Sequence, residues 1–590
     1  MRFRACLFAF LTLSSGAFAQ QAADAVQPEI AGAGQVALSD AVSAAQEAKG
    51  QGRPVAADDW MVSAANPYAV EAGARVLRAG GSAADAMVAV QAVLGLVEPQ
   101  SSGLGGGAFL VWYDAQSGKV TTLDGREAAP LAATPRLFQN DAGEPLDFFD
   151  AVAGGRSVGV PGTPALMSEA HRRWGRAEWA GLFDDAIRLA DEGFEVSPRL
   201  ATMVAADAGR LSRFPATRAY FLPGGEAITA GSTLRNADYA EVLRILASDG
   251  ANPFYTGLIA QDIAATVQQE SGLLTPMDFA IYTVKERAPV CMGYRAHEVC
   301  GMGPPSSGAL TVGQILGLLS PFDMAALGPD APEAWRLIGD ASRLAFADRG
   351  RYMADTDFVP VPVKGLLAPD YLRERSRLLE GDDALPEVAP GQPEFDHALN
   401  WADDRSLELP STSHISIVDA QGNALSMTTT IENAFGSRLM VQGFLLNNEL
   451  TDFSFASHAN GRPIANRVEP GKRPRSSMAP TIVLKDGKPV LVVGSPGGSR
   501  IIGYVAKTII AYLDWGMDVQ QAIDLPHLVN RFGTYDIEPG LTGARLALAL
   551  ADMGFEVALS PMVSGLHAIA IEDRLRGGAD TRREGIALGQ

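Results

Sequence analysis

The sequence predicts a mixed α/β fold in which sheets pack face to face and helices cover their outer sides. Strand patterns begin near Trp60 and return after residue 411, while helical periodicity dominates between about 160 and 385 and returns near the C-terminus. The content of 47% hydrophobic and 20% charged residues is that of a soluble globular protein with a sizeable core. A length of 590 residues could fill several domains, yet large two-layer enzymes often keep such a length in one unit.

The expected elements of the first part of the chain are placed by periodicity and by turn residues. They are a strand at 61–64, helices at 67–77 and 82–96 separated by Gly80-Gly81, a buried strand at 108–113, and helices at 333–352 and 372–379.

The stretch 381–410 is rich in Asp and Pro, and we expect it to be an exposed connector that ends at Pro410. Strands follow at 416–418 and 424–430, joined by a turn at 420–423. A second hairpin joins 481–484 to 489–493 around Asp486-Gly487, and helices are expected at 502–513 and 519–523. The connector is a suitable place for an internal scission.

The N-terminus has the pattern of a secretory signal over residues 1–19. Arg2 and Arg4 precede the apolar run 5–13, and Ala17-Phe18-Ala19 forms a small-x-small cleavage site before Gln20. We therefore expect an exported protein, periplasmic or secreted. The apolar run is too short to span a bilayer, and no later stretch of 18 uncharged apolar residues occurs, so no membrane span is expected. Residues 20–55, rich in Ala, Gln and Gly, are expected to form a flexible leader.

The charge balance excludes one class of partner. The chain carries 48 basic and 68 acidic residues, a net charge of −20, which repels phosphate backbones and argues against nucleic acid.

The cysteines predict a disulfide rather than a metal site. Cys6 leaves with the signal, so Cys291 and Cys300 remain, and an even pair in an oxidising compartment favours a bridge; two reduced core thiols are the alternative. The seven histidines show no ligand spacing, and this cysteine pair does not make a zinc site. No metal is implied.

The segment Ser411-Thr412-Ser413-His414 carries the chemistry. Threonine is a weak nucleophile, but at a chain terminus its own α-amine, with a pKa near ~7.7–8.0, can act as the base. Thr412 would gain that amine only if the chain cut itself between Ser411 and Thr412. The alternative is an ordinary surface strand start. His414 invites a Ser/His triad, yet a terminal amine needs no imidazole, so a packing histidine is favoured.

Two glycine-rich stretches have different meanings. A strand, not a helix, follows the glycines at 103–107, so the context for binding a dinucleotide is missing. The stretch 494–500 leaves a strand and enters a helix, where the amides of Gly497 and Gly498 could hold an oxyanion. A plain turn is the alternative for that stretch.

Several motifs in order give the chain a resemblance to a known family. The motifs from residue 412 onward are Thr412-Ser413-His414, the run from Leu446 to Phe453, the run from Arg473 to Met478, and Gly494 to Ile502. Upstream motifs are Glu98-Pro99 with Gly103 to Gly107, Leu123 to Glu127, Gly159 to Gly162, and Ala345 to Arg349. From about Trp60 to the C-terminus, the chain resembles the γ-glutamyltranspeptidases, which are N-terminal nucleophile hydrolases with a four-layer αββα core.

The resemblance implies a role for each matching residue and no cofactor. Thr412 would be the nucleophile, Thr430 a second hydroxyl that orients it, and Gly497 and Gly498 the oxyanion amides. The substrate's α-carboxylate would be held by Arg126, with Ser476 and Ser477 beside it. Its α-ammonium would be held by Glu449 and Asp452, which are expected opposite Arg126 across one pocket. A large subunit, 56–411, and a small catalytic subunit, 412–590, would form one composite αββα domain as a heterodimer.

Two features depart from the pattern of many members. Glu432 stands where many have Asn, and it could add a third acidic contact to the ammonium. The segment 453–471, which in many members forms a lid with an aromatic residue, contains no Tyr here, so its role as a lid stays open.

The expected reaction is acyl transfer from glutathione or other γ-glutamyl compounds to water, amino acids or peptides. One alternative is an acylase of the same fold for glutaryl or cephalosporin-type side chains, which would not need Glu449 and Asp452. Another is an unprocessed binding protein that kept the pocket and lost catalysis.

Overall fold

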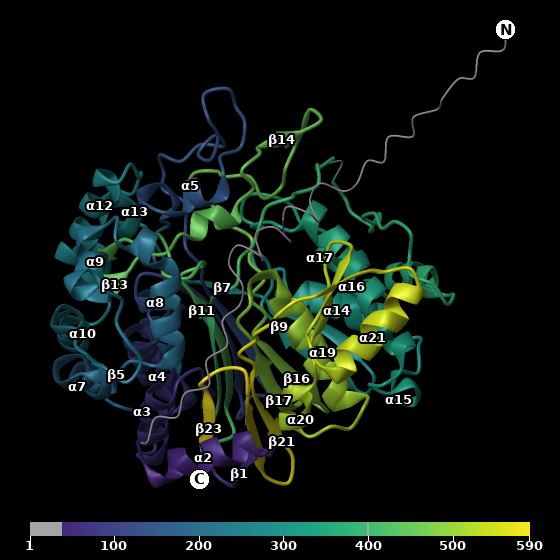
Figure 1. Ribbon diagram of the computed structural model, residues 1–590, viewed down its shortest axis with the longest axis horizontal. Coiled ribbons are helices and arrows are strands. Elements are labelled where there is room, and N and C mark those ends of the chain that lie inside the picture. The colour runs from purple at the N-terminus through teal and green to yellow at the C-terminus, as the bar shows by residue number, and fades with distance from the viewer. Residues whose placement is uncertain (1–19, 21–37, 398–399) are drawn as a thin grey trace.

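The structure is a computed structural model that describes residues 20, 38–397 and 400–590. The predicted signal peptide and residues 21–37 of the predicted leader lie outside the described residues. Two seven-stranded sheets stand side by side between a left-hand and a right-hand layer of helices (Figure 1).

The first sheet contains the strand that begins beside Thr412. Its strand order is β23-β2-β10-β11-β3-β4-β7, and every neighbouring pair is antiparallel. In that order the strands are β23 (Ile586–Gly589), β2 (Met61–Ala64), β10 (Ser413–Val418), β11 (Ala424–Thr430), β3 (Gly107–Asp114), β4 (Lys119–Gly125) and β7 (Lys285–Arg287).

The second sheet has the order β1-β22-β21-β17-β16-β9-β8 and is also antiparallel throughout. Its strands are β1 (Val55–Ala57), β22 (Leu575–Ala579), β21 (His567–Ile571), β17 (Lys488–Gly494), β16 (Thr481–Lys485), β9 (His297–Gly301) and β8 (Val290–Tyr294).

The inner faces of the two sheets bury one shared apolar cluster. Because side chains alternate along a strand, each inner strand gives one set of residues to this cluster and the other set to its helical layer. On β10, Val418 belongs to the cluster between the sheets, whereas Ile415 and Ile417 face the helices. The cluster consists of Ala57, Met61, Val111, Tyr113, Cys300, Val418, Ala424, Ile482, Leu484, Val492, Ile569 and Leu575.

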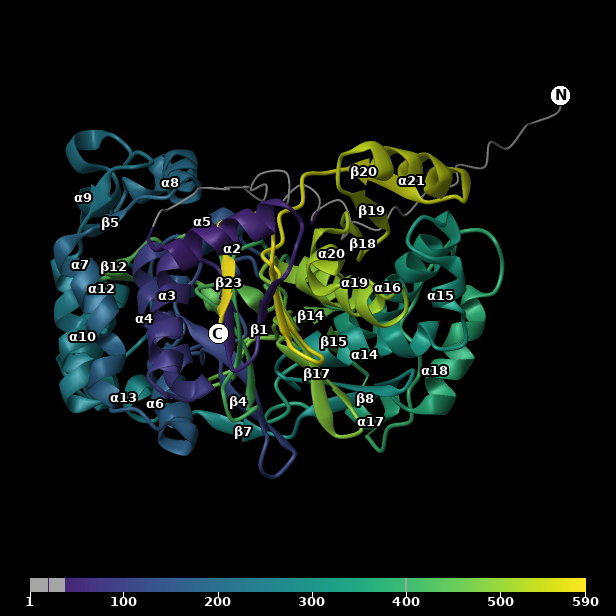
Figure 2. The same cartoon turned by 90° about the horizontal axis from the view of Figure 1, so that it is seen from below.

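The helical layer over the first sheet is built mainly from residues 67–280 (Figure 2). Its helices are α3 (Pro67–Arg78), α4 (Ala83–Val97), α5 (Phe148–Val152), α6 (Thr163–Trp174), α7 (Asp184–Glu192), α8 (Pro198–Leu211), α9 (Pro215–Phe221), α10 (Ala237–Asp249), α11 (Asn252–Thr256), α12 (Leu258–Gln269) and α13 (Pro276–Ala280). Ser82 starts α4 with a capping box, since its hydroxyl accepts from the Asp85 amide and Asp85 accepts from the Ser82 amide.

The second layer packs on the other sheet. Its helices are α14 (Gly308–Leu319), α15 (Met324–Leu327), α16 (Pro332–Tyr352), α17 (Val363–Leu366), α18 (Pro369–Ser376), α19 (Ile501–Leu513), α20 (Val519–Asp524) and α21 (Leu541–Asp552). Smaller sheets are formed by β5 (Phe194–Glu195) with β6 (Thr233–Leu234), β12 (Met440–Val441) with β13 (Phe444–Leu445), β14 (His458–Ala459) with β15 (Arg462–Pro463), and β18 (Leu528–Asn530), β19 (Thr534–Ile537) and β20 (Glu556–Leu559). Among the described residues, no helix is long and apolar enough to cross a membrane.

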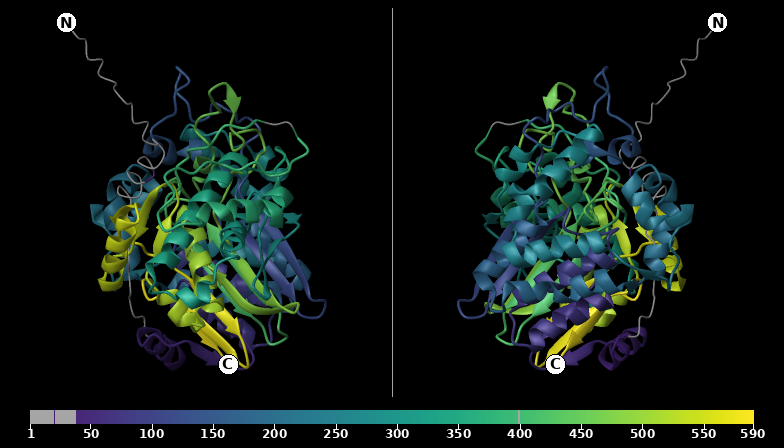
Figure 3. Two further views of the ribbon diagram at one scale, coloured as in Figure 1. Left: turned by 90° about the vertical axis from the view of Figure 1, so that its right-hand side faces the viewer. Right: turned by 90° about the vertical axis from the view of Figure 1, so that its left-hand side faces the viewer.

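Part of the predicted leader is folded, which corrects the sequence-based expectation. Residues 40–50 form α2 (Asp40–Gly50), which begins after the cap Ser39 and lies against β23 near the C-terminus (Figure 3). The Lys49 ammonium donates to the backbone carbonyls of Arg583 and Gly585 at 2.7 and 2.6 Å. Tertiary contacts therefore order a helix that its composition alone did not indicate.

The predicted connector also differs from expectation at its end. Residues 408–411 are buried, with Glu408 only 5% and Ser411 only 1% exposed. The predicted helix at 372–379 begins earlier, as α18, and its last residues form a 3-10 turn at Arg377–Leu379.

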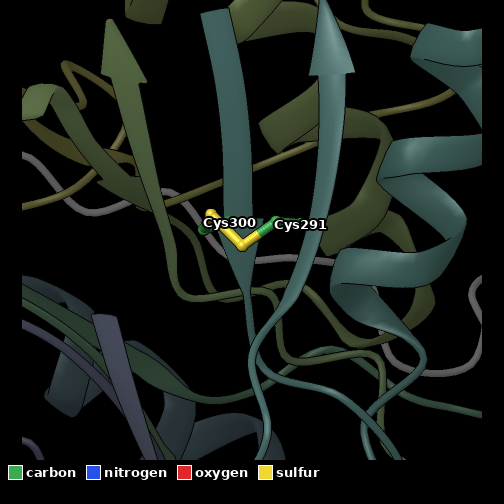
Figure 4. Close-up of a disulfide and its surroundings, with 2 residues drawn as sticks. All are labelled: Cys291 and Cys300. Atoms are coloured by element: carbon green, nitrogen blue, oxygen red, sulfur yellow. A yellow bond between two sulfur atoms is a disulfide. The ribbon is translucent and has the colours of Figure 1, made fainter. Parts of the chain in front are cut away.

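Cys291 and Cys300 are joined by a disulfide between neighbouring strands (Figure 4). The two residues are direct partners in the register of β8 and β9 at the edge of the second sheet. The bridge predicted from the sequence is thus present in the structure, and it closes a short loop.

Removing this bridge should lower stability modestly. Closing so short a loop removes about 2–3 kcal/mol of unfolded-state entropy in the chain-entropy model. We expect a Cys291→Ser/Cys300→Ser variant to have a lower Tm than the wild type, and dithiothreitol to lower the Tm of the wild type but not of the variant. Alkylation of both thiols in the wild type without reductant would contradict the bridge.

Candidate functional site

Thr412 and Thr430 lie side by side at one end of the gap between the sheets. Ser413 pairs with Thr429 in the β10–β11 register, so Thr412 and Thr430 stand one step beyond that pair. Both lie on the face that looks toward the second sheet, because Val418 and Ala424, an even number of residues away on the two strands, belong to the cluster between the sheets. Their hydroxyl oxygens are 3.1 Å apart, within hydrogen-bond distance.

The backbone around this pair is constrained. Thr412 has φ +92°, a conformation that is a genuine outlier for a β-branched residue and costs on the order of 1–3 kcal/mol. The Thr430 hydroxyl accepts a hydrogen bond from the amide of Glu432 at 2.9 Å, which fixes its direction. Thr412 is therefore held in a strained backbone conformation directly after the Ser411–Thr412 bond.

The glycine loop after β17 contacts the carbonyl of that bond. The amide of Gly497 donates to the carbonyl oxygen of Ser411 at 3.2 Å. Gly497 and Gly498 have φ +134° and +54°, and a Cβ on Gly498 would lie 2.7 Å from the carbonyl oxygen of Leu409. The glycine loop for which the sequence predicts an oxyanion role thus lies at this bond, with the Gly497 amide on the Ser411 carbonyl and Gly498 lining the same cavity as Thr412.

Arg126 is in direct contact with the two acids that the sequence placed opposite it. Its guanidinium is ion-paired with Glu449 and with Asp452, and it is 1% exposed. It also donates to the backbone carbonyls of Pro474 and Arg475 at 3.2 and 2.8 Å. The expectation that Arg126 faces Glu449 and Asp452 across a pocket is wrong, because opposite charges so deeply buried pair with each other.

This pocket wall contains more carboxyls than cations. Arg126 lies among the carboxyls of Glu127, Glu432, Glu449 and Asp452. Burial raises the pKa of each of them, to about 7 for Glu127, to about 6 for Asp452, and well above the usual value for Glu432 and Glu449. An added cation would be attracted to this wall and would release protons from it.

Glu432 joins the same wall from the end of β11. Its carboxylate accepts a hydrogen bond from the side-chain amide of Asn448, which also donates to Thr451 at 2.9 Å. Glu432 has φ +72° and lines the cavity with Thr412 and Asp452. The structure therefore places this residue with the other acids, as the sequence predicted.

Ser476 and Ser477 line the same cavity as the acids but make different contacts. The Ser476 hydroxyl accepts from the amide of Met478 at 3.1 Å. The Ser477 hydroxyl donates to the carboxylate of Glu408 and accepts from Arg349 at 2.6 Å. Both serines line the cavity.

The open space in the site is small, about 20 Å³, which is room for about one water molecule. The lining includes Glu408 and Leu409 from the segment before Thr412. That segment is held from behind by Gln20, whose side-chain amide exchanges hydrogen bonds with the backbone of Glu408 at 2.8 and 3.1 Å. In the uncut chain, the segment before Thr412 therefore forms part of the cavity wall, and little open space remains.

The predicted lid segment, 453–471, borders a larger hollow. Phe453 is buried, the β14–β15 hairpin projects from the segment, and Phe455 stacks on Phe138 with ring centroids 4.6 Å apart. Between this segment and residues 402–407 lies a cavity of about 520 Å³.

His414 is a packing residue, as the sequence favoured. Its ring nitrogens lie 2.9 Å from the Thr428 hydroxyl and 3.0 Å from the Ser416 hydroxyl. Burial, together with nearby His567, lowers the pKa of His414 well below its usual value, so the ring is neutral.

Sequence reasoning missed four residues of this site: Glu127, Arg349, Glu408 and Arg475. Three of them stand inside motifs that were recognised. Glu127 and Arg475 are also next to residues that were assigned roles, and that adjacency was the available signal for these two. Glu408 had none, since it lies in a stretch with the composition of an exposed connector. Within the described residues, the group of possible metal ligands is Cys291, Glu298 and Cys300, and its two sulfurs are already bonded to each other.

Comparison with known proteins assigns the family. A family model described as gamma-glutamyltranspeptidase matches residues 69–590. The chain belongs to the γ-glutamyltranspeptidase family. The glutathione hydrolase proenzyme of Bacillus subtilis strain 168 is 38% identical to this transpeptidase-family chain over 544 residues, which cover 90% of the chain and 91% of the relative.

Two acylases are also similar to this chain. The acylase ACY 1 proenzyme of Pseudomonas sp. strain SE83 is 33% identical over 547 residues, 91% of the chain and 94% of the relative. The crystal structure of cephalosporin acylase from Bacillus halodurans superposes with a TM-score of 0.82 at 26% identity, covering 91% of the chain and 97% of that structure. The predicted αββα fold is confirmed.

The hydrogen bonds of Thr430 provide a test of the site. Thr430→Val keeps the shape but leaves the Glu432 amide and the Thr412 hydroxyl without that partner, so we expect a loss of roughly 1–3 kcal/mol in unfolding free energy. Thr429→Val is the matched control on the same strand, because the buried Thr429 hydroxyl has no hydrogen-bond partner among the described residues. Thermal unfolding should show a lower Tm for Thr430→Val alone, and equal shifts for both variants would contradict this geometry.

Proposed function

We propose that this protein is a self-cleaving γ-glutamyltranspeptidase and glutathione hydrolase with Thr412 as its nucleophile. One observation carries the proposal. The carbonyl of the intact Ser411–Thr412 bond accepts a hydrogen bond from Gly497, while the Thr412 hydroxyl is paired with Thr430 and its backbone is strained. These are the parts that acyl transfer needs: a nucleophile, an orienting group and an oxyanion donor.

The same parts would first act on the chain itself. The Thr412 oxygen bonds to the Ser411 carbonyl carbon, the bond to the Thr412 nitrogen breaks, and the hydroxyl proton moves to that nitrogen. Water then hydrolyses the resulting ester, which releases a Ser411 carboxylate and restores the Thr412 hydroxyl. Strain at φ +92° favours this step because it is relieved when the peptide bond breaks.

Turnover would repeat that chemistry on a donor. The free α-amine of Thr412 takes the hydroxyl proton as the oxygen attacks the γ-carbonyl, and gives it to the departing amine. The γ-glutamyl ester is then resolved by water, an amino acid or a peptide. Glutathione is the proposed donor because the relatives named glutathione hydrolase match most of the chain.

The two walls of the cavity suit the two charges of a glutamyl head group. Glu449, Asp452 and Glu432 would hold the α-ammonium. Ser476, Ser477 and Arg126 lie beside one another for the α-carboxylate, with Arg126 shared with its acidic partners. No cofactor enters this scheme, and the two products of scission, a large fragment that ends at Ser411 and a small one that covers 412–590, would remain together as a heterodimer.

We further propose that the protein is exported and acts in the periplasm or outside the cell. The signal-like N-terminus supports this, and an oxidising compartment would maintain the Cys291–Cys300 bond.

The second candidate function is that of a glutaryl or cephalosporin-type acylase, which the acylase relatives support. A glutaryl group has no ammonium, so it would leave the acidic wall without a ligand. The excess of carboxyls around Arg126 therefore favours the γ-glutamyl donor.

Self-cleavage predicts two polypeptides. The wild type should give a small fragment that covers 412–590 and a large one that ends at Ser411, whereas Thr412→Ala should remain one inactive chain. A denaturing gel and N-terminal sequencing check this, and a small fragment that begins with anything other than Thr-Ser-His contradicts Thr412 as the nucleophile. A wild type that stays intact would support the unprocessed binding protein.

The acidic wall predicts donor specificity. Asp452→Asn should weaken γ-glutamyl donors, because the ammonium loses a buried partner, at a cost of roughly 2–5 kcal/mol. Glutaryl donors should be hardly affected or even improved, since they bring no cation to the wall. The measurement is kcat/KM for the γ-glutamyl and glutaryl p-nitroanilides.

Two outcomes of this measurement would count against the proposal. Equal losses on both donors would make Asp452 a residue of the fold rather than of the substrate site. A wild type that prefers the glutaryl donor would assign the protein to the acylases.

A further inference from the structure

The carboxylate of Glu408 lies in a buried seat provided by distant parts of the chain. One oxygen accepts from Nη2 of Arg349 and, at 3.4 Å, from Nη2 of Arg475. The other accepts from the hydroxyl of Ser477. We call Arg349, Arg475 and Ser477 the Glu408 seat, and all three are less than 5% exposed.

The seat is shaped by contacts that do not involve Glu408. Nε of Arg349 donates to the Ser307 hydroxyl at 2.7 Å, and its Nη2 donates to the Ser477 hydroxyl at 2.6 Å. Arg349 belongs to the 21-residue helix α16, and the Arg475 amide donates to the side chain of Asn466 at 3.0 Å. The seat would therefore keep its geometry if Glu408 left it.

The segment before the scission contacts Arg475 with alternate residues. Nη1 of Arg475 lies 3.1 Å from a carboxylate oxygen of Asp404, and its Nη2 donates to the Ser406 hydroxyl at 3.1 Å. Glu408 is the next residue in this series. Residues two apart share one face of an extended chain, so a single polar face of the segment covers the arginine.

The side of Thr412 on which the acyl group lies connects Glu408 with the carboxylate of the donor. Self-cleavage and turnover use the same hydroxyl and the same Gly497 amide, so the acyl group lies on the same side of Thr412 in both reactions. In the uncut chain that acyl group is the segment ending at Ser411, and the carboxylate that this segment contributes to the lining of the same cavity is that of Glu408. In a γ-glutamyl donor, the carboxylate behind the reacting carbonyl is the α-carboxylate.

We propose that Glu408 occupies, in the uncut chain, the place of the donor's α-carboxylate, and that Arg349 and Arg475 bind that carboxylate after scission. This inference depends on the γ-glutamyl function proposed above. It adds two specificity-determining arginines to the site and makes the segment before Thr412 an internal stand-in for the substrate.

The balance of charge supports this assignment. When the segment leaves, two buried guanidinium groups lose Glu408 and Asp404, and an unpaired buried charge is costly, so a small carboxylate is drawn to the seat. Burial, with Arg475 alongside, already lowers the pKa of Arg349. Arg126, by contrast, is paired with Glu449 and Asp452 and has less charge to offer a carboxylate.

The test compares two donors that differ only in this carboxylate. They are γ-glutamyl-p-nitroanilide and 4-aminobutyryl-p-nitroanilide, which has the same amide and the same ammonium. In Arg475→Met and in Arg349→Met, the ratio of kcat/KM for the first donor to that for the second should fall by about ten- to a hundredfold, the effect of one lost charged hydrogen bond. The fall should appear mainly in KM.

Arg473→Met is the matched control. Arg473 is an equally buried arginine two residues away, but it pairs with Asp124 and the carbonyl of Thr283 instead of the seat. The Arg473→Met variant should keep the wild-type ratio of kcat/KM for the two donors, even where its stability changes.

If a methionine variant stays uncut, the lysine variant at the same position takes its place, because lysine keeps the charge but loses the planar fork, and the ratio should still fall. An unchanged ratio in variants at both positions overturns the inference while leaving the γ-glutamyl function intact. A wild type that turns over neither donor overturns the proposed function itself.

Discussion

The site depends on the register between β10 and β11. A five-residue turn joins these strands, and their pairing sets Thr412 opposite Thr430 on the face between the two sheets. A slip of one residue in either strand would turn the hydroxyl of that strand toward the helical layer, where Ile415 and Ile417 now pack. The apolar cluster between the sheets opposes such a slip, so core packing and nucleophile placement are one constraint. Strand β17 of the facing sheet then delivers the glycine loop to the same end of the gap.

Around this centre the protein buries many ionisable groups, and the balance between burial and pairing differs from one to the next. Arg126 neutralises part of the acidic wall, while Arg349 and Arg475 face Glu408. Burial alone would raise the pKa of Glu408, but the two arginines outweigh it and lower that pKa to about 2, so this carboxylate stays ionised. The acids near Arg126 show the opposite result, since burial outweighs their share of one cation. The carboxyls near Arg126 thus hold their protons easily, whereas Arg349 and Arg475 carry a fixed positive charge. This difference in charge matches a zwitterionic ligand.

Local patterns predicted the secondary structure near the site well. The hairpin at 413–430, the strand at 107–114 and the capped helix α4 all carry short-range signals, so alternation and turn residues were sufficient. The pairing of Arg126 with Asp452 joins residues 326 apart, and the sequence could give their charges but not their contact. The burial of Glu408 could not be predicted for a related reason. Arginines from α16 and from the 473–478 stretch bind its carboxylate, so a segment of polar composition lies in the interior. The helix α2 was missed since it is stabilised by docking on the C-terminal segment rather than by its own composition.

The order of strands has a consequence for the cleaved protein. In the first sheet, β23, β10 and β11 come from the part after residue 411, while β2, β3, β4 and β7 come from the part before it, and β2 lies between β23 and β10. In the second sheet, the neighbouring strands β22, β21, β17 and β16 come from the part after residue 411. They are flanked by β1 on one side and by β9 and β8 on the other, which come from the part before it. The two fragments share both sheets, so they have no simple interface along which they could dissociate. Their separation would break hydrogen-bonded strand pairs in the core. The cleaved protein should therefore neither exchange fragments nor dissociate on dilution while it is folded, and on heating the unfolding of the sheets and the separation of the fragments should occur in one step.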